Sequence, residues 1–193
     1  MKKTIAFGLF IFTGIFLQAQ TLSWDIKFFK GSERETIPVN RIITMETGEE
    51  FQISIVPDSD CFGYVIAYDS QRKIHILHNA PLRKDTVLNL GPMKLTTPSG
   101  TETFFIVMGL NRETRLENLI QAYNNNRNSG RHAENLRREI ARLQNAVSSL
   151  GEPASVFIPS GGTTRGTTGG TTGEYTNRFS GKSVYVRTVT IRH

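Results

Sequence analysis

Short runs of alternating apolar and polar residues fill the chain from residue 24 to residue 109. In residues 51–55, Phe-Gln-Ile-Ser-Ile, every second side chain is apolar, which is the period of a strand with one buried face. Residues 103–108 are almost continuously apolar, as in a strand buried on both faces near the middle of a sheet. Because such runs alternate with turn-forming residues, the pattern predicts a mainly β fold, an antiparallel β-sandwich or barrel.

Polar turn residues separate the runs and predict how neighbouring strands connect. Residues 57–60, Pro-Asp-Ser-Asp, end one strand before residues 62–68 begin the next. Residues 69–72 then form a polar turn before residues 73–77, so these two segments are expected to form a hairpin. The remaining strand candidates are residues 24–28, 87–90 and 93–95.

The spacing of apolar residues changes after Gly109, from steps of two to steps of three and four. This period predicts a two-helix insertion at about residues 112–150, interrupted by the turn-forming residues 124–130. The first helix carries the apolar residues Leu116, Leu119, Ile120 and Tyr123. The second carries a stripe of Ala133, Leu136, Ile140, Leu143, Val147 and Leu150, and Gly151 and Pro153 are expected to end it.

The apolar stripe of the second helix requires a partner surface. It can cover the sheet, pack against the first helix, or pair with the same helix of another subunit in a homo-oligomer. The stripe is short for an independent coiled coil, so packing within the chain is the preferred interpretation.

The chain after the helices divides into two contrasting segments. Residues 160–173 are nearly all Gly and Thr and are expected to form a flexible surface tract. Residues 183–191 are rich in β-branched and aromatic residues, and we expect them to return to the main sheet as the final strand. Residues 20–193 are therefore predicted to form a single β-rich domain with the helices inserted before its last strand.

The N-terminal residues 1–19 have the layout of a secretory signal peptide. Lys2 and Lys3 precede an apolar run over residues 4–17, and Ala19 is the small residue expected before a cleavage site. An uncleaved anchor is the alternative, because Leu17 occupies the place of the first small residue in the usual cleavage pattern. No cysteine lies at the cut, which excludes a lipoprotein anchor. We expect an exported protein, periplasmic or extracellular.

Positive charge is concentrated in the C-terminal part of the chain. Residues 112–193 contain 12 Lys and Arg against 6 Asp and Glu, whereas residues 20–111 contain 9 against 11. Such an imbalance can attract an anionic polymer or membrane surface, and the residues that would do so are Arg131, Arg137, Arg138 and Arg142. A solvated helix face explains most of these charges equally well, and specific nucleic-acid binding is not expected.

Three stretches resemble an uncharacterised bacterial family, domain of unknown function 4384. They are Gly-Tyr-Val-Ile-Ala-Tyr-Asp at residues 63–69, Lys-Ile-His-Ile-Leu-His-Asn at 73–79 and Pro-Ser-Gly-Thr-Glu at 98–102. The resemblance covers roughly residues 48–110, and it departs from the family pattern at His78, where a Pro usually precedes the Asn, and in the helical insertion. It implies an accessory β-sandwich module of exported or envelope-associated proteins, with no known activity and no catalytic residues.

The histidines and acidic turn residues are the first candidates for a metal or acid-base site. His75 and His78 are three residues apart on a strand and are expected on opposite faces, which makes them a poor metal clamp. His132 begins a helix, and His193 is the last residue. Asp58 and Asp60 can bind calcium, but capping of the turn is the preferred interpretation.

The sequence also lacks the usual signatures of nucleophilic and phosphate sites. Cys61 is the single cysteine, and a lone cysteine most often packs as a small apolar residue. There is no Gly-x-Ser-x-Gly motif, and the Gly-rich tract lacks the Gly-Lys-Ser/Thr ending of a phosphate loop. No catalytic, cofactor-binding or metal-binding residue is therefore assigned, and no cofactor is expected.

Two aromatic doublets place one ring on each face of their strands. They are Phe28 with Phe29 and Phe104 with Phe105. Their rings are expected in the core or against the helices, and the alternative is an exposed binding platform.

These observations favour an exported, non-enzymatic binding or structural module of the bacterial cell envelope, whose partner is a protein or another envelope component. A secreted hydrolase with an unrecognised site, using Asp58, Asp60, His75 or His78, is the first alternative. Electrostatic binding to an anionic polymer or membrane through the four arginines is the second.

Overall fold

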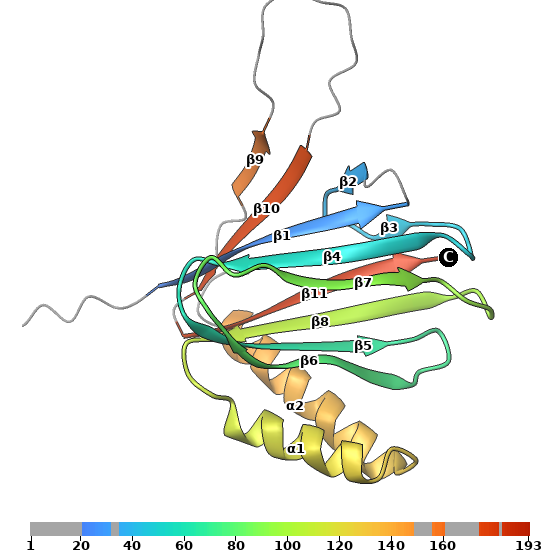
Figure 1. The fold of residues 1–193 in the computed structure, drawn as a ribbon. Coiled ribbons are helices and arrows are strands. Elements are labelled where there is room, and N and C mark those ends of the chain that lie inside the picture. Colours follow the sequence, from blue (N-terminus) through green and yellow to red (C-terminus); the bar gives the residue numbers. More distant parts are fainter. Residues whose placement is uncertain (1–20, 32–34, 149–155, 161–173, 182) are drawn as a thin grey trace, which may run out of the picture.

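The computed structural model describes residues 21–31, 35–148, 156–160, 174–181 and 183–193. Their strands form two sheets that pack face to face with their edges unjoined, so the fold is a β-sandwich and not a closed barrel (Figure 1). The first sheet has the order β7 (Leu88–Lys94), β4 (Glu50–Pro57), β1 (Leu22–Lys30), β10 (Glu174–Gly181), β9 (Val156–Ser160), and β2 (Glu35–Ile37) also pairs with β1. The second sheet has the order β3 (Ile43–Thr44), β11 (Val184–Arg192), β8 (Thr101–Gly109), β5 (Cys61–Tyr68), β6 (Ile74–Leu82).

Alternation along the strands produces the core between the sheets. In β1 every second side chain, from Leu22 through Trp24 and Ile26 to Phe28, is fully buried. Trp24 lies edge-on against Tyr185 of the facing sheet, with ring centroids 4.8 Å apart. Side chains from both sheets therefore interlock in a single apolar layer, as the period of two predicts.

Helices α1 (Thr114–Asn125) and α2 (Gly130–Ser148) cover the outer face of the second sheet (Figure 1). They form a second apolar cluster with β5, β6 and β8, whose buried members are Leu116, Ile120, Tyr123, Leu136, Ile140, Leu143, Tyr64, Ile66, Tyr68, Ile74 and Val107. β5 and β8 are thus buried on both faces, which confirms that residues 103–108 form a central strand. The preferred interpretation of the helical stripe, packing within the chain, is confirmed for Leu136, Ile140 and Leu143.

Most predicted strands are present, with three differences. The β5–β6 hairpin and the final strand are confirmed, and β11 lies in the second sheet between β3 and β8. Residues 87–90 and 93–95 were expected as separate strands, but β7 is one strand paired with β4 through an irregular register. Four strands, β2, β3, β9 and β10, were not predicted. Three strands, β9, β10 and β11, therefore follow the helices. The sequence predicted only the last of them.

Several predicted features lie outside the described residues. They are the signal peptide at residues 1–19, the Gly/Thr tract beyond Ser160, Leu150 with the side chain of Val147, and the helix end at Gly151 and Pro153. Ser160 itself ends β9.

Both aromatic doublets divide between the two faces of their strands. Phe28 and Phe104 are buried in the sandwich core. Phe105 faces the helices and lies edge-on to Tyr68, with ring centroids 5.4 Å apart. The prediction of core or helix contact is confirmed for these three rings, and Phe29 is half-buried on the face of β1 opposite Phe28.

Candidate functional site: a slot between the β6 and β7 edges

A β-bulge in β6 brings two histidines to the same face of the sheet. His75 pairs with Ala67 and His78 pairs with Val65, so the four residues 75–78 of β6 lie opposite the three residues 65–67 of β5. Val65 and Ala67 both point into the sandwich core, and the histidines opposite them share that face. The prediction that His75 and His78 lie on opposite faces is wrong, because it assumed a regular strand and the extra residue reverses the alternation.

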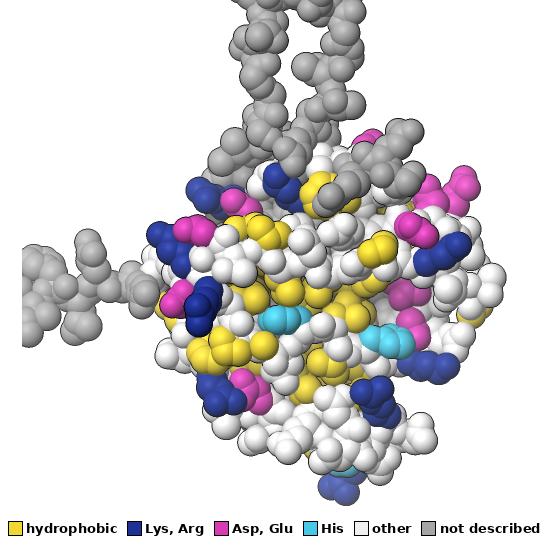
Figure 2. Space-filling view, viewed as in Figure 1, with side chains coloured by type: hydrophobic (Ala, Val, Ile, Leu, Met, Phe, Trp, Pro, Cys, Tyr) yellow, Lys and Arg dark blue, Asp and Glu magenta, His cyan; other side chains and the backbone are white. Residues whose placement is uncertain are grey.

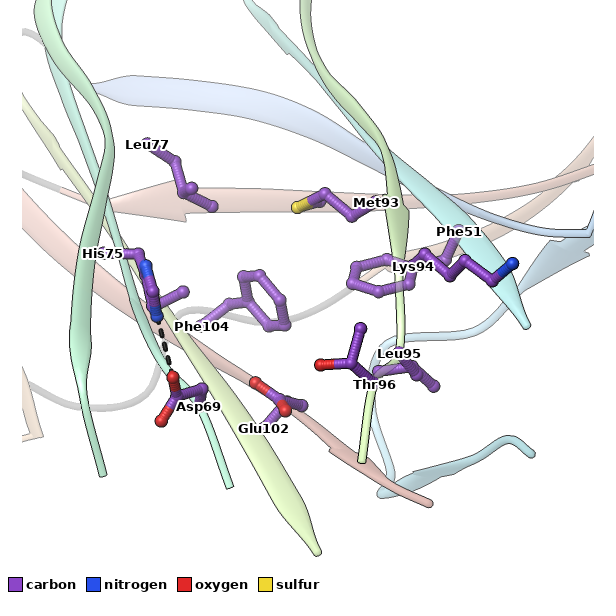
Figure 3. A pocket seen from close by; sticks show the side chains of 11 residues that line it. Phe51, Asp69, His75, Leu77, Met93, Lys94, Leu95, Thr96, Glu102 and Phe104 are labelled. Carbon is purple, nitrogen blue, oxygen red and sulfur yellow. Dashed lines mark hydrogen bonds and ion pairs between the residues drawn. The ribbon is translucent and has the colours of Figure 1, made fainter. Parts of the chain in front are cut away.

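The sandwich is open where β6, the edge of the second sheet, faces β7, the edge of the first. A pocket with a volume of about 320 Å³ lies at this opening, which we call the slot (Figure 3). Its lining residues are Phe51, Ala67, Asp69, His75, Leu77, Met93, Lys94, Leu95, Thr96, Glu102 and Phe104. Figure 2 shows this side of the molecule, where apolar side chains reach the surface beside histidines. The slot is therefore a place where part of the sandwich interior is uncovered.

Aromatic rings form the rigid wall of the slot. Phe51 stacks on Phe28 with centroids 5.3 Å apart and lies edge-on to Phe104 at 5.5 Å. Leu77 of β6 and Met93 of β7 point toward each other, and both are partly buried (Figure 3). The rings are fixed by core packing, while Leu77 and Met93 keep exposed surface that a ligand can cover.

One end of the slot is built from the turn between β5 and β6. Oδ1 of Asp69 accepts backbone N–H groups of Gln71 at 2.9 Å and Lys73 at 2.8 Å, an arrangement typical of Asp at a turn. Oδ2 of Asp69 lies 2.8 Å from Nε2 of His75. Arg72 completes the tight turn with a φ of 63°.

These contacts determine the charge of Asp69. Burial alone would raise the pKa of Asp69, but the hydrogen bonds from His75, Lys73 and Gln71 outweigh it and hold the pKa below its usual value. An ionised Asp69 accepts a hydrogen bond, so Nε2 of His75 is the donor of this contact. Asp69 thereby positions His75, whose side chain is 51% exposed.

Glu102 of β8 is the second carboxylate in the slot and is only 13% exposed. Its Oε1 accepts the backbone N–H of Ser70 at 3.2 Å and lies 3.4 Å from Nε2 of His193. The histidine contact is an ion-pair distance without hydrogen-bond geometry. Nδ1 of His193 lies 3.1 Å from Oγ1 of Thr47. Glu102 is therefore anchored through one oxygen, and no described residue hydrogen-bonds to Oε2.

The remaining candidate residues of the sequence do not join this site. Asp58 accepts the backbone N–H of Ser23 at 3.1 Å, and Asp60 accepts that of Lys84 at 2.8 Å. Both donors are distant in sequence and lie outside the turn at residues 57–60, so capping of that turn stays a prediction. Both aspartates precede β5, whereas His75 pairs with the opposite end of that strand. The four residues of the hydrolase alternative are consequently not brought together.

His132 and Cys61 also lie apart from the slot. The backbone N–H of His132 donates to Oγ of Ser129 at 3.3 Å near the start of α2, and Cys61 is buried in the sandwich core. Over the part of the chain that is described, no three His, Cys, Asp or Glu side chains are grouped to hold a metal ion.

Three of the four candidate arginines are paired with carboxylates. Arg137 and Arg138 contact Glu134 at 3.5 and 3.0 Å, and Arg142 contacts the buried Glu139 at 2.7 Å. The guanidinium of Arg137 also lies over the ring of Tyr68, 5.2 Å from its centroid. Three of the arginines expected to attract an anionic surface are therefore already engaged with carboxylates of the same helix.

Sequence reasoning missed the slot residues Asp69, Leu77, Met93 and Glu102. Residues 69–72 were interpreted only as a polar turn, and the available signal was an Asp at the start of a turn followed six residues later by His75. The slot combines residues from β4, β5, β6, β7 and β8, so no local pattern could predict it.

Comparison of the chain with models of protein families gives no match, and comparisons with curated proteins and with solved structures give none either. Function must therefore be inferred from the chain's own geometry. The resemblance to domain of unknown function 4384 stays a prediction. Among the described residues, no helix is both long enough and apolar enough to cross a membrane.

Proposed function

We propose that this chain is an exported, non-enzymatic binding module of the bacterial cell envelope and that the slot between β6 and β7 is its binding site. The observation that carries the proposal is the opening of the sandwich interior to the surface at Leu77 and Met93. A volume of about 320 Å³ falls at the lower end of the range of about 300–1,000 Å³ for small-molecule pockets. Apolar walls with a few polar groups at one end are the usual composition of such sites.

The arrangement around the Asp69–His75 pair favours binding over catalysis. A nucleophilic mechanism needs a hydroxyl or thiol within reach of the imidazole. Oγ of the adjacent Ser70 donates its hydrogen bond to the carbonyl of Pro98 at 2.9 Å, which engages it elsewhere. Cys61 lies at the far end of β5 from the pair. In the described residues the pair therefore orients a ring beside an apolar slot without a positioned nucleophile.

The proposal that the protein is exported is based on its sequence. The layout of residues 1–19 and the resemblance to an envelope-associated family both support it. In an exported protein, the ligand of the slot is a component of the envelope or its surroundings.

The binding proposal is tested by methyl NMR on purified protein titrated with a library of small apolar and amphipathic compounds. We expect some compounds to shift the methyl signals of Ala67, Leu77 and Met93 together. The variant Met93→Trp should fill the slot and abolish these shifts, because the larger ring occupies the ligand volume. The matched control Val87→Trp adds the same ring at a position 51% exposed just before β7 and should bind normally. Equal binding by Met93→Trp, or no slot shift with any compound, would contradict the proposal.

A further inference from the structure

The slot has an apolar end and a polar end. The polar end contains more hydrogen-bond acceptors than donors. Phe51, Phe104, Leu77 and Met93 surround the apolar part, and Glu102 and the Asp69–His75 pair lie together at the other end (Figure 3). A ligand that fills both parts must carry an apolar body and one polar group. The chemistry of that polar group can be inferred from the groups it would meet.

Hydrogen-bond acceptors predominate at the polar end. Asp69 is fully engaged, because Oδ1 accepts two backbone N–H groups and Oδ2 accepts from His75. Oε2 of Glu102 receives no hydrogen bond from any described residue, although the side chain is only 13% exposed. Nε2 of His75 carries the hydrogen donated to Asp69. Oε2 of Glu102 is not among the fully buried unpartnered atoms of the described residues, so it reaches solvent and is open to a donor from a ligand.

Lys94, the lysine among the described residues that line the slot, does not supply that donor. Lys94 lines the pocket, but its ammonium group points away from Glu102 (Figure 3). The hydroxyl of Thr96 points toward Glu102, and it is neutral. The polar end therefore holds two carboxylates, Asp69 and Glu102, next to aromatic faces, and aromatic faces also attract cations. His193 lies 3.4 Å from Oε1 of Glu102, which is the oxygen that also accepts from Ser70, and leaves Oε2 open.

We infer that the slot binds a small organic ammonium compound, with an aromatic or branched apolar group between Phe51, Phe104, Leu77 and Met93 and its ammonium group beside Oε2 of Glu102. This inference rests on the proposed binding function and specifies its ligand class. The volume of about 320 Å³ restricts the ligand to a small molecule. Glu102 supplies the charged hydrogen bond, and the aromatic faces of Phe51 and Phe104 flank the ligand.

Three probes with the same phenylethyl body separate charge from apolar burial: 2-phenylethylammonium, 2-phenylethanol and 3-phenylpropionate. Affinities are measured by methyl NMR titration at Ala67, Leu77 and Met93. We expect the ammonium to bind about tenfold more tightly than the alcohol, which is the usual gain from a hydrogen bond to a charged group. The carboxylate should bind most weakly, because it would face Glu102.

The variant Glu102→Gln keeps the shape of the side chain and removes its charge. It should weaken binding of the ammonium about tenfold and leave binding of the alcohol unchanged. Glu35→Gln is the matched control, because it removes one negative charge from an exposed position on β2, away from the slot. If Glu102→Gln does not fold, the ammonium, alcohol and carboxylate series on the unaltered protein separates charge from apolar burial.

Each outcome decides the inference. Equal binding of ammonium and alcohol, preference for the carboxylate, or an unchanged ammonium affinity in Glu102→Gln would each overturn the ammonium inference and leave slot binding intact. Failure of all three probes would overturn the inference too. The wider compound library then decides separately whether the slot binds any ligand, so the two proposals can fail independently.

Discussion

Nε2 of His75 lies 2.8 Å from Oδ2 of Asp69, and the other oxygen of the same carboxylate holds the turn between β5 and β6. One side chain thus links the local geometry of a hairpin to the polar end of the slot. Removing the Asp69 side chain should lower the stability of the fold and change the orientation of His75.

The stability contributed by Asp69 should depend on pH in a defined direction. Because its hydrogen bonds hold the folded-state pKa below the ordinary value of 3.8, the contribution is present above pH 3.8 and disappears as pH falls through the folded-state pKa. Asp69→Ala should lower the free energy of unfolding by about 1–2 kcal/mol near neutral pH. Urea unfolding of the unaltered protein and of Asp69→Ala, near pH 7 and below pH 3, measures the difference in their free energies of unfolding. This difference should be smaller at the acidic pH. Asp69→Asn, whose amide oxygen can still accept both backbone N–H groups, is the control for the turn. A deficit that persists unchanged in acid would argue against the ionic contribution.

Tyr64 fastens the start of α1 to the second sheet. Its hydroxyl accepts the backbone N–H of Glu113 and donates to Oε1 of Glu117, both at 2.9 Å. Burial, with the charge of Glu117 adding to it, raises the pKa of Tyr64 to about 12, so the hydroxyl remains a donor. Tyr64→Phe should cost about 1–2 kcal/mol, because the N–H of Glu113 loses its partner.

Hydrogen exchange provides the local measurement for Tyr64→Phe. The amide of Glu113 and the first turn of α1 should exchange faster, while β1 and β4 remain protected. Glu117→Gln keeps an acceptor for the hydroxyl and should perturb the turn less. Unchanged exchange at Glu113 in Tyr64→Phe would contradict the role of this contact.

The helix pair should depend on the buried stripe of α2. Ile140 is 1% exposed and packs in the cluster between the helices and the second sheet. Ile140→Ala should lower the free energy of unfolding by about 2–4 kcal/mol through lost burial and a residual cavity. Arg138→Ala, on a side chain that is 75% exposed, should change it by less than about 0.5 kcal/mol. Denaturant unfolding of both variants measures the contrast, and similar small losses would mean that the stripe is not buried in solution.

Cys61 should be unreactive in the folded protein. Burial, followed by the charges of Asp60 and Asp58, raises the pKa of its thiol to about 11. At about pH 8 only about one thiol in a thousand is then ionised, so labelling by a disulfide reagent should be slow and should become fast in urea. Asp60→Asn is a useful second variant, because it removes a nearby charge and leaves the thiol buried. Rapid labelling of the native protein would show that the strand start at Cys61 opens readily.

Export makes a separate prediction about residues 1–19. Expression of the full chain in a bacterium should give a processed protein that begins at Gln20, because cleavage is expected after Ala19. N-terminal sequencing of the protein from periplasmic and culture fractions measures this. Replacing Ala19 with Arg should block processing, whereas replacing the more distant Thr21 should not. A protein that retains Met1 in the membrane fraction would support the anchor alternative.

Elements with a strong apolar period can be predicted from the sequence. Alternation in residues 24–28 and 51–55 predicted β1 and β4, the apolar run at 103–108 predicted the central strand β8, and steps of three and four predicted both helices. These features are local, because burial of one face imposes a period on consecutive side chains. Short strands such as β3 carry too few residues to show any period, and they form only because β11 offers backbone hydrogen bonds.

The site, in contrast, depends on how distant strands pair and pack. The bulge in β6, which brings His75 and His78 to one face, is a property of pairing with β5 and leaves no mark in the spacing of the sequence. The slot exists because the edges of β6 and β7 remain unjoined, which depends on the order of strands in both sheets. Phe51, Leu77, Glu102 and their neighbours come from separate strands, so their juxtaposition is set by how the two sheets pack and not by any local pattern.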